Sequence, residues 1–174
     1  MAGPLHGDNH SPLLYTLNAT ELYEVTTIAG SKPVAYGGWT DATGTSAEFY
    51  SPYGGVLSKD GNELYVIDTK NNCIRTLDLA TKAVTTIAGS GSYGSTDAIG
   101  TSAKFKEPYG GVLSKDGNEL YVMDGSNLIR ALDLATKAVT TIAGSAGSHQ
   151  YGSTDATGTI GHECEVQLSK ACST

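Results

Sequence analysis

The chain repeats itself, and this repetition limits the fold more than any other feature of its 174 residues. The hexapeptide VTTIAG begins at Val25, Val84 and Val139, at spacings of 59 and 55 residues (84 − 25 and 139 − 84). The segment 51–68 returns as 107–124 with a change at only two positions. Self-similarity at a period near 50 residues is typical of architectures built from one supersecondary unit used several times.

Each repeat contains four short stretches with strand character. They span residues 55–58, 63–68, 73–78 and 83–88 in the first copy. Asp60-Gly61 separates the first two stretches and favours a tight hairpin, because Gly adopts positive φ at little cost. The second stretch is apolar on both alternating faces, so its sheet must lie between two other sheets. The pattern predicts an all-β fold of four-stranded antiparallel β-propeller blades, two of them complete, with partial blades at both ends of the chain.

The repeated motifs resemble the NHL repeat, a propeller blade motif. The resemblance is carried by F-x-x-P-Y-G-G-V, D-G-N-E-L-Y-V-x-D and N-x-x-I-R, and it is strong from residue 49 to residue 144. The motif positions are Phe49, Pro52, Asp68 and Arg75 in the first copy and Phe105, Pro108, Asp124 and Arg130 in the second. The resemblance implies propeller architecture and says little about activity.

The repeat divides the chain into four units. Residues 1–30 are predicted to form the outer strands of a partial blade, at 13–17 and 22–29. Residues 31–89 and 90–144 each hold a crossing segment and a full blade, and residues 145–174 a crossing segment and a degenerate inner strand near 165–170. Three blade-equivalents are too few for a ring of about 4–8 blades. Either the chain is a fragment of a longer propeller, or two copies form a six-bladed dimer in which Val166 and Leu168 lie beside Leu13 and Leu17 of the other copy.

Charge and composition exclude several partners. The net charge is −7 and the pI is about 4.9, without a basic patch, so neither nucleic acid nor an anionic membrane is expected to bind. No apolar run approaches the about 20 residues of a membrane helix, and no signal peptide is visible, which leaves the localisation open. Cys73, Cys164 and Cys172 lack metal-ligand spacing, and their role is open as well.

Catalytic and metal sites are not expected. The NHL-like family includes lyases whose channel histidines hold zinc, but the four histidines here lie in end segments or a crossing, at positions 6, 10, 149 and 162. Ser58 and Ser114 follow the inner strands without a neighbouring His, and they are interpreted as structural. Asp68 and Asp124 are expected to bind turn N–H groups and an Arg or Asn within the blade. We therefore expect a non-enzymatic protein without a cofactor; a channel-centred hydrolase or lyase and a truncated inactive fragment remain the alternatives.

The crossing segments between blades are the candidate binding site, because long loops on a rigid scaffold are where propellers bind ligands. They repeat an aromatic, a hydroxyl and a carboxylate, a set suited to a glycan, a peptide or another protein. The candidate residues are Tyr36, Trp39, Asp41, Tyr93, Asp97, Tyr151 and Asp155. Trp39 is the strongest single anchor. The favoured alternative is structural: each Thr-Asp forms a local turn and each Tyr packs on a blade edge.

Overall fold

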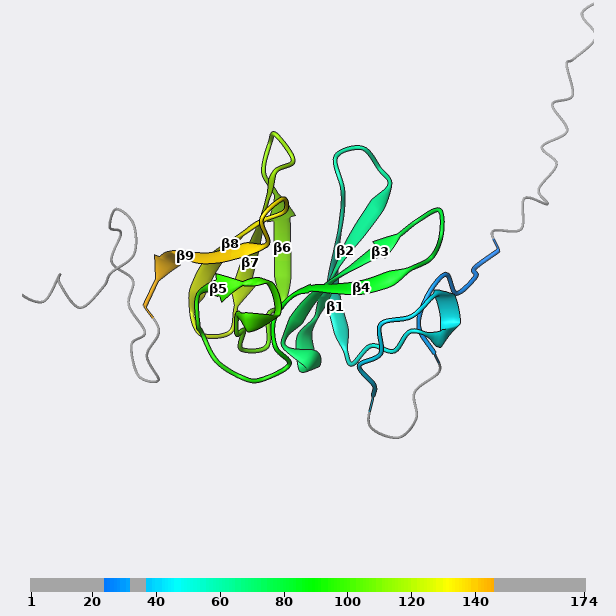
Figure 1. Cartoon of the computed structure of the whole chain (residues 1–174), viewed down its shortest axis with the longest axis horizontal. Helices are drawn as coiled ribbons and strands as arrows, with labels where there is room; N and C mark the ends of the chain where they lie inside the picture. The colour runs from blue at the N-terminus through cyan, green and yellow to red at the C-terminus, as the bar shows by residue number, and fades with distance from the viewer. Residues whose placement is uncertain (1–23, 32–36, 146–174) are drawn as a thin grey trace, which may run out of the picture.

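Each repeat forms one antiparallel sheet in the computed structural model, which describes residues 24–31 and 37–145 (Figure 1). Blade 1 consists of β1 (Pro52–Leu57), β2 (Glu63–Asp68), β3 (Cys73–Asp78) and β4 (Val84–Ala88), in that order. Blade 2 consists of β6 (Gly110–Leu113), β7 (Glu119–Asp124), β8 (Leu128–Asp133) and β9 (Ala138–Gly144), with β5 (Ala98–Ile99) outside β9. Single 3-10 turns lie at η1 (Gly44–Ser46), η2 (Thr69–Asn71) and η3 (Gly100–Ser102). The all-β prediction and the four strands per repeat are confirmed.

The first two strands of each blade meet in the Asp-Gly turn that the sequence predicts. Gly61 has a φ of 77° and Gly117 a φ of 84°, in the left-handed region that favours glycine. Ser58 stabilises its turn from both sides: its hydroxyl donates to the Asp60 carboxylate over 2.7 Å and accepts from the Glu63 backbone N–H over 2.9 Å. The structural interpretation of this serine is confirmed.

The main core lies between the two blades. Ile67 and Ile74 of blade 1 are fully buried against Phe105 and Leu120, which belong to the crossing segment and blade 2. The inner strands β1 and β6 lie side by side at this contact (Figure 1). One face of β2 thus packs against blade 2, and Leu64 on the other face is partly buried against a small cluster of Ala47, Leu77 and Val84.

Different turns lie at the two ends of the pair of blades. The β1–β2 and β3–β4 turns and their counterparts in blade 2 lie at one end, which we call the hairpin end. The β2–β3 turns and the starts of the inner strands lie at the other, which we call the crossing end. Each crossing segment first follows the outer strand of its blade: the Val84 N–H donates to the Ala42 carbonyl over 2.9 Å, and β5 pairs with β9. The second crossing segment then returns between the blades to the crossing end, with Ala103 and Phe105 in the core between them.

Part of the predicted architecture lies outside the described residues. This holds for the strands at 13–17 and 165–170, for the degenerate blade after residue 145, and for the four histidines. Residues 24–29, which were predicted as part of an outer strand, have no strand pairing within the described part of the chain. The division into four units and the contact between terminal strands of two copies stay predictions.

Candidate functional site

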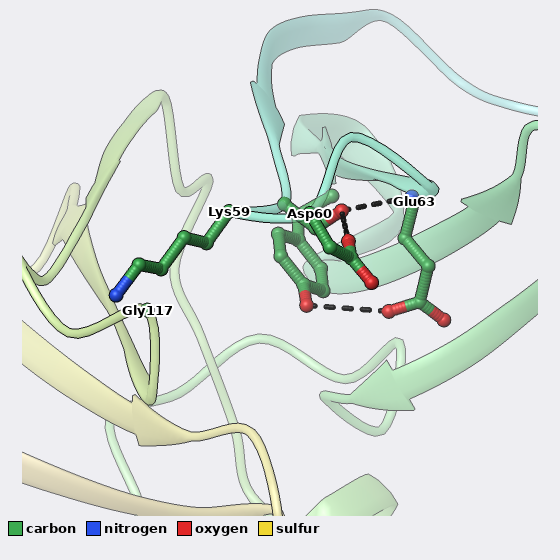
Figure 2. Close-up of a pocket in the computed structure, with 6 residues that line it drawn as sticks. Lys59, Asp60, Glu63 and Gly117 are labelled. Atoms are coloured by element: carbon green, nitrogen blue, oxygen red, sulfur yellow. Dashed lines mark hydrogen bonds between the residues drawn. The ribbon is translucent and has the colours of Figure 1, made fainter.

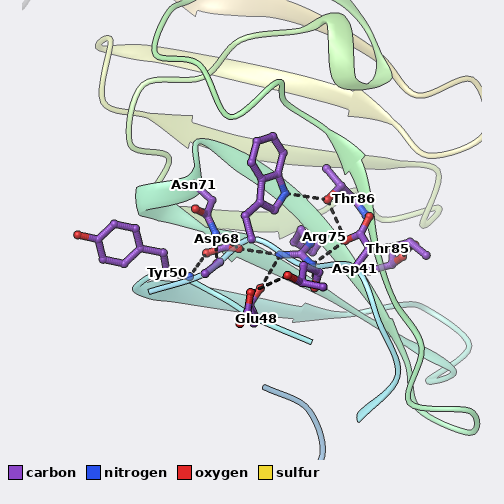
Figure 3. A network of polar contacts seen from close by, with 12 residues as sticks. Asp41, Glu48, Tyr50, Asp68, Asn71, Arg75, Thr85 and Thr86 are labelled. Carbon is purple, nitrogen blue, oxygen red and sulfur yellow. Dashed lines mark hydrogen bonds and ion pairs between the residues drawn. The ribbon is translucent and has the colours of Figure 1, made fainter. Parts of the chain in front are cut away.

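The carboxylates of the crossing segments are held by their own blades. Asp41 accepts hydrogen bonds from Arg75 Nη2 over 2.6 Å, from the Thr86 backbone N–H over 2.9 Å and from the Thr86 hydroxyl over 3.0 Å (Figure 3). Asp97 repeats this arrangement with Arg130 over 2.6 Å and with Thr141 over 2.9 Å in both contacts. These bonds join each crossing segment to the outer half of the blade that follows it.

A fully buried arginine forms the centre of each network. Arg75 Nη1 donates to Asp68 over 2.9 Å and to the Glu48 carbonyl over 3.0 Å, and Nη2 also donates to the Thr40 carbonyl over 2.9 Å. Its guanidinium lies 5.0 Å from the centroid of the Phe49 ring. The rigid fork of a guanidinium suits this task, because it can serve several acceptors at fixed angles. One side chain thereby ties together β2, β3 and both arms of the crossing segment (Figure 3).

The same network recurs in blade 2. We call this arrangement, a buried arginine that holds two aspartates and the crossing segment, the clamp. Arg130 donates to Asp124 over 3.2 Å and to the carbonyls of Lys104 and Thr96 over 3.1 Å each, and it lies 5.2 Å from the Phe105 centroid. Asp68 additionally accepts from the backbone N–H of Tyr50 over 2.8 Å. Asp124 accepts from the backbone N–H of Ser126, in the turn that follows it, over 2.9 Å. The predicted arginine partner is confirmed for both aspartates and the predicted turn N–H group for Asp124, whereas the N–H group that binds Asp68 comes from the crossing segment.

The two described aromatic residues of the predicted site differ in their contacts: Trp39 packs on the chain, and Tyr93 is more exposed. The Trp39 indole N–H donates to the Thr86 hydroxyl over 3.2 Å, and its ring covers Gly91, where a Cβ would overlap it. The Trp39 side chain is still 45% exposed. Tyr93 is 61% exposed, and the Lys106 ammonium lies 5.4 Å from its ring centroid. Tyr36, Tyr151 and Asp155 lie outside the described residues, and ligand binding by all seven residues stays a prediction.

A second set of aromatic residues, which the sequence did not predict as a site, lies at the crossing end. Tyr53 begins the inner strand of blade 1 and is 77% exposed, and Tyr109 at the equivalent place in blade 2 is 51% exposed. Tyr50 is 40% exposed beside them in sequence. The signal was present as Pro-Tyr-Gly-Gly in both repeats, but a tyrosine next to two glycines within a strand motif suggests packing rather than exposure. We call Trp39, Tyr50, Tyr53, Tyr93 and Tyr109 the crossing-end aromatics.

The hairpin end carries two open hollows between and beside the turns. One of about 470 Å³ is lined by Ser58, Lys59, Asp60, Glu63, Tyr65 and Gly117 (Figure 2). The other, of about 530 Å³, is lined by Lys59, Ser114, Lys115, Asp116, Glu119 and Tyr121. Their polar groups mostly bind one another: the Tyr65 hydroxyl donates to Glu63 over 3.2 Å, and the Tyr121 hydroxyl to Glu119 over 2.9 Å.

The pKa values of Tyr65 and Asp60, which line the first hollow, are both shifted away from neutral pH. Burial, followed by the charge of Glu63, raises the pKa of Tyr65 to about 12. Hydrogen bonds from Ser58 and then from Asn62 lower the pKa of Asp60. A general acid or base needs a pKa near the working pH, and these shifts move both groups away from it. Within residues 24–31 and 37–145, no three His, Cys, Asp or Glu side chains come together as a possible metal site. In the same residues no helix is long and apolar enough to cross a membrane.

Together these features define two adjoining blades of a β-propeller. The sequence is 37% identical to the human protein named NHL repeat-containing protein 2 over 107 residues, which is 60% of this chain and 15% of that protein. It is 33% identical over 112 residues to the protein SUPPRESSOR OF QUENCHING 1, chloroplastic, of Arabidopsis thaliana, covering 59% of this chain and 10% of the relative. The repeated part of this chain is thus similar to proteins that carry NHL repeats, as its sequence motifs imply. The chain spans only a small share of the length of these relatives.

Two other comparisons add little. A crystal structure of an auxiliary nutrient binding protein from Bacteroides ovatus is similar with a TM-score of 0.49 and 26% identity, covering 56% of this chain and 26% of that one. No family model matches the chain.

Proposed function

We propose that this chain is a non-enzymatic binding scaffold: a propeller segment that holds a peptide, a glycan or another protein at the crossing end and completes its ring by self-assembly. The crossing-end aromatics carry the proposal. They are 40–77% exposed, and they stand on blades whose crossing segments are clamped by Arg75 and Arg130. Aromatic side chains provide large contact areas at low entropic cost and dominate binding hot spots.

The internal use of the polar groups supports a role without catalysis. The serines and aspartates of the hairpin end are hydrogen-bonded within their turns, and Asp41 and Asp97 serve the buried arginines. Near-identical blades also present the same side chains twice, whereas an active site combines different ones. A channel-centred hydrolase or lyase predicts a tightly held metal ion after purification, so elemental analysis finding about one ion per chain would favour the enzyme over the scaffold.

A second candidate is a segment of a longer propeller protein. It is favoured by the 15% of the human relative and 10% of the plant relative that the matched regions cover. In that case the missing blades come from the same polypeptide rather than from a second copy. The binding role of the crossing end is the same in both cases.

Binding can be tested with an oligosaccharide array and a random peptide display library, followed by fluorescence titration of the selected probe. We expect the variant with Tyr53→Ala and Tyr109→Ala to bind the probe at least tenfold more weakly at an unchanged melting temperature. Ile99→Ala is the matched control, because Ile99 is 66% exposed on the edge strand β5 and pairs with Ala138 near the hairpin end. A probe bound equally well by both variants would refute the crossing-end site.

A further inference from the structure

The three VTTIAG segments end in the same way, although only two of them belong to the two blades. Gly30, Gly89 and Gly144 have φ values of 100°, 97° and 95°. The Gly30 N–H donates to the first carbonyl of η1 over 3.1 Å, as the Gly89 N–H does to the first carbonyl of η3 over 3.2 Å. Ala29 packs against the small buried cluster at blade 1. Residues 24–30 therefore lie beside the crossing segment of blade 1 as the end of β4 lies beside that of blade 2, in the place of a preceding outer strand.

The first valine of these segments differs greatly in exposure. Val84 and Val139 are each 2% exposed, whereas Val25 is 96% exposed. A crossing segment covers the valine in each blade: the Val84 N–H donates to the Ala42 carbonyl over 2.9 Å, and Ala42 packs against the cluster that contains Val84. In blade 2, Ala98 lies opposite Val139 in the pairing of β5 with β9. Val25 has no such cover among the described residues.

The second threonine of each segment holds the crossing carboxylate in both blades. Thr86 donates to Asp41 from its backbone N–H over 2.9 Å and from its hydroxyl over 3.0 Å, and blade 2 repeats both contacts. Thr27 is the equivalent residue after Val25, and it is exposed. Residues 24–30 thus present the valine and the threonine on which a crossing segment lies in each blade.

The sequence also contains a third crossing segment. The motif T-D-A occurs in residues 40–42, 96–98 and 154–156. Each of the first two copies lies on the outer strand of the blade that follows it. Residues 154–159 repeat residues 40–45 without change, and Asp155 follows the glycine that ends β9 by 11 residues (155 − 144), as Asp41 follows Gly30 (41 − 30). The third segment therefore has the sequence and the length to reach one further outer strand beyond blade 2.

We infer that residues 154–159 of one copy dock on residues 25–30 of a second copy, as residues 40–45 dock on β4. The inference rests on the self-assembly in the proposed function, and it names the segment and the strand that make the contact. Blades 1 and 2 separate the two segments within one chain, and the described ends at 24 and 145 lie at opposite sides of the molecule (Figure 1). Made in both directions, the contact joins two chains into a ring with two blades from each chain and one shared position at each contact. Such a ring falls within the range of about 4–8 blades.

The contact between copies keeps the threonine half of the clamp. Thr27 provides the N–H and the hydroxyl for the Asp155 carboxylate, as Thr86 does for Asp41. The arginine has no counterpart there, because the chain has only two arginines and both hold the aspartate of their own crossing segment. The side chains of Asp41 and Asp97 are 44% and 45% exposed, so water solvates a carboxylate at this place. Docking therefore buries no unpaired charge.

The first experiment measures whether the two segments meet. Val25 and Ala156 correspond to Val139 and Ala98, which are cross-strand partners, so cysteines at the two places should form a disulfide between copies. One chain carries Val25→Cys, and the other carries Ala156→Cys, activated as the mixed disulfide with thionitrobenzoate. Attack by the thiolate at position 25 forms the disulfide between the chains and releases thionitrobenzoate, which is measured by its absorbance.

Thr26→Cys is the matched control for Val25→Cys, because neighbouring residues of a strand point to opposite faces. Its counterpart in blade 1, Thr85, is exposed although the crossing segment is in place. Cys73 is fully buried and is kept, and the other two cysteines are replaced by serine in every chain. We expect Val25→Cys to react at least tenfold faster than Thr26→Cys and to give a covalent dimer on a non-reducing gel.

The second experiment disrupts the docking strand. Light scattering on the full chain at micromolar concentration should give the mass of two 18.0 kDa chains. Val25→Lys should reduce the mass to that of one chain, because the docked segment would cover a charge. Thr26→Lys adds the same charge one residue along and should leave the mass at two chains. The circular dichroism spectrum should be unchanged in Val25→Lys, since Val25 is 96% exposed and supports no packing within its own chain.

The outcomes separate this inference from the proposed function. An oligomer that keeps its mass in Val25→Lys, and that reacts no faster at Val25→Cys than at Thr26→Cys, would refute this contact and leave self-assembly standing. A single-chain mass for the wild type at all concentrations would refute both. A disulfide closed within one chain that carries both cysteines would show that the segment docks on its own chain, which also refutes the second copy. Loss of probe binding in the tyrosine variants is independent of these results.

Discussion

Replacing Asp41 by alanine distinguishes two roles of its carboxylate: a structural role in the clamp and a role in ligand binding. The side chain makes three hydrogen bonds of 2.6 to 3.0 Å, one of them to a guanidinium that is completely buried. Removing one partner of a buried, hydrogen-bonded charge costs about 3–5 kcal/mol. The carboxylate is 44% exposed and Arg75 retains Asp68, so solvent and the second carboxylate reduce this cost. We expect Asp41→Ala to lower the free energy of unfolding by about 2–3 kcal/mol.

The chain contains its own replicate of this experiment. Asp97 contacts Arg130 and Thr141 as Asp41 contacts Arg75 and Thr86, and its side chain is 45% exposed. Asp97→Ala should therefore cost the same amount within about 0.5 kcal/mol. Asp41→Asn retains a hydrogen-bond acceptor without the charge and should cost about half as much.

Urea denaturation followed by circular dichroism at 25 °C measures these differences. Losses below about 0.5 kcal/mol for both alanine variants, the range of ordinary surface substitutions, would refute the clamp. If the same variants lost binding of a selected probe at unchanged stability, the carboxylates would be ligand groups, as the crossing-segment hypothesis states.

Three further predictions concern local groups. Gly61→Val should lower the free energy of unfolding, measured by urea denaturation, by about 1–3 kcal/mol through the positive φ alone. Gly117→Val should cost more, because the added Cβ would lie 2.9 Å from the Cβ of Lys59. Burial raises the pKa of the Cys73 thiol to about 12, so the reactive thiolate is scarce in the folded protein. In a variant with the other two cysteines replaced by serine, a disulfide reagent at about pH 8 should label the chain only after unfolding. Hydrogen bonds lower the folded-state pKa of Asp60 and of Asp116. The stability that these carboxylates contribute is therefore present above their unfolded pKa and is lost as the pH falls through the lowered value. Thermal melts should show the melting temperature dropping below about pH 4, and dropping less in the variant with Asp→Asn at both sites.

The strands could be predicted from the sequence because their determinants are local. An Asp-Gly pair between two apolar stretches specifies the hairpin, and the second copy of the repeat confirms the boundaries of the first. The strand of Ala98 and Ile99 was missed for the same reason. It consists of two residues in a segment with turn composition, and it forms only because β9 offers it a free edge. The inner strand of blade 1 also begins at Pro52, three residues before the predicted start.

The clamp could be predicted only in part. The partnership of Asp68 with Arg75 follows from their positions in adjacent strands, seven residues apart along one hairpin. The partnership of Asp41 with Arg75 joins residues 34 apart, and it depends on a crossing segment that follows the outer strand before it turns inward. No periodicity encodes that path. The aspartate therefore resembled a free loop carboxylate until the fold placed a buried arginine next to it.

The clamp changes which crossing-end groups are suited to bind a ligand. A ligand that took a hydrogen bond from the blade by displacing Asp41 would leave Arg75, which is completely buried, with one carboxylate fewer. That loss opposes binding by roughly the energy that the contact contributes to folding. Tyr53 and Tyr109 carry no such cost, since the two residues are 77% and 51% exposed at the starts of the inner strands. The clamped carboxylates thus position the crossing segments, and the exposed tyrosines beside them are the groups free to contact a partner.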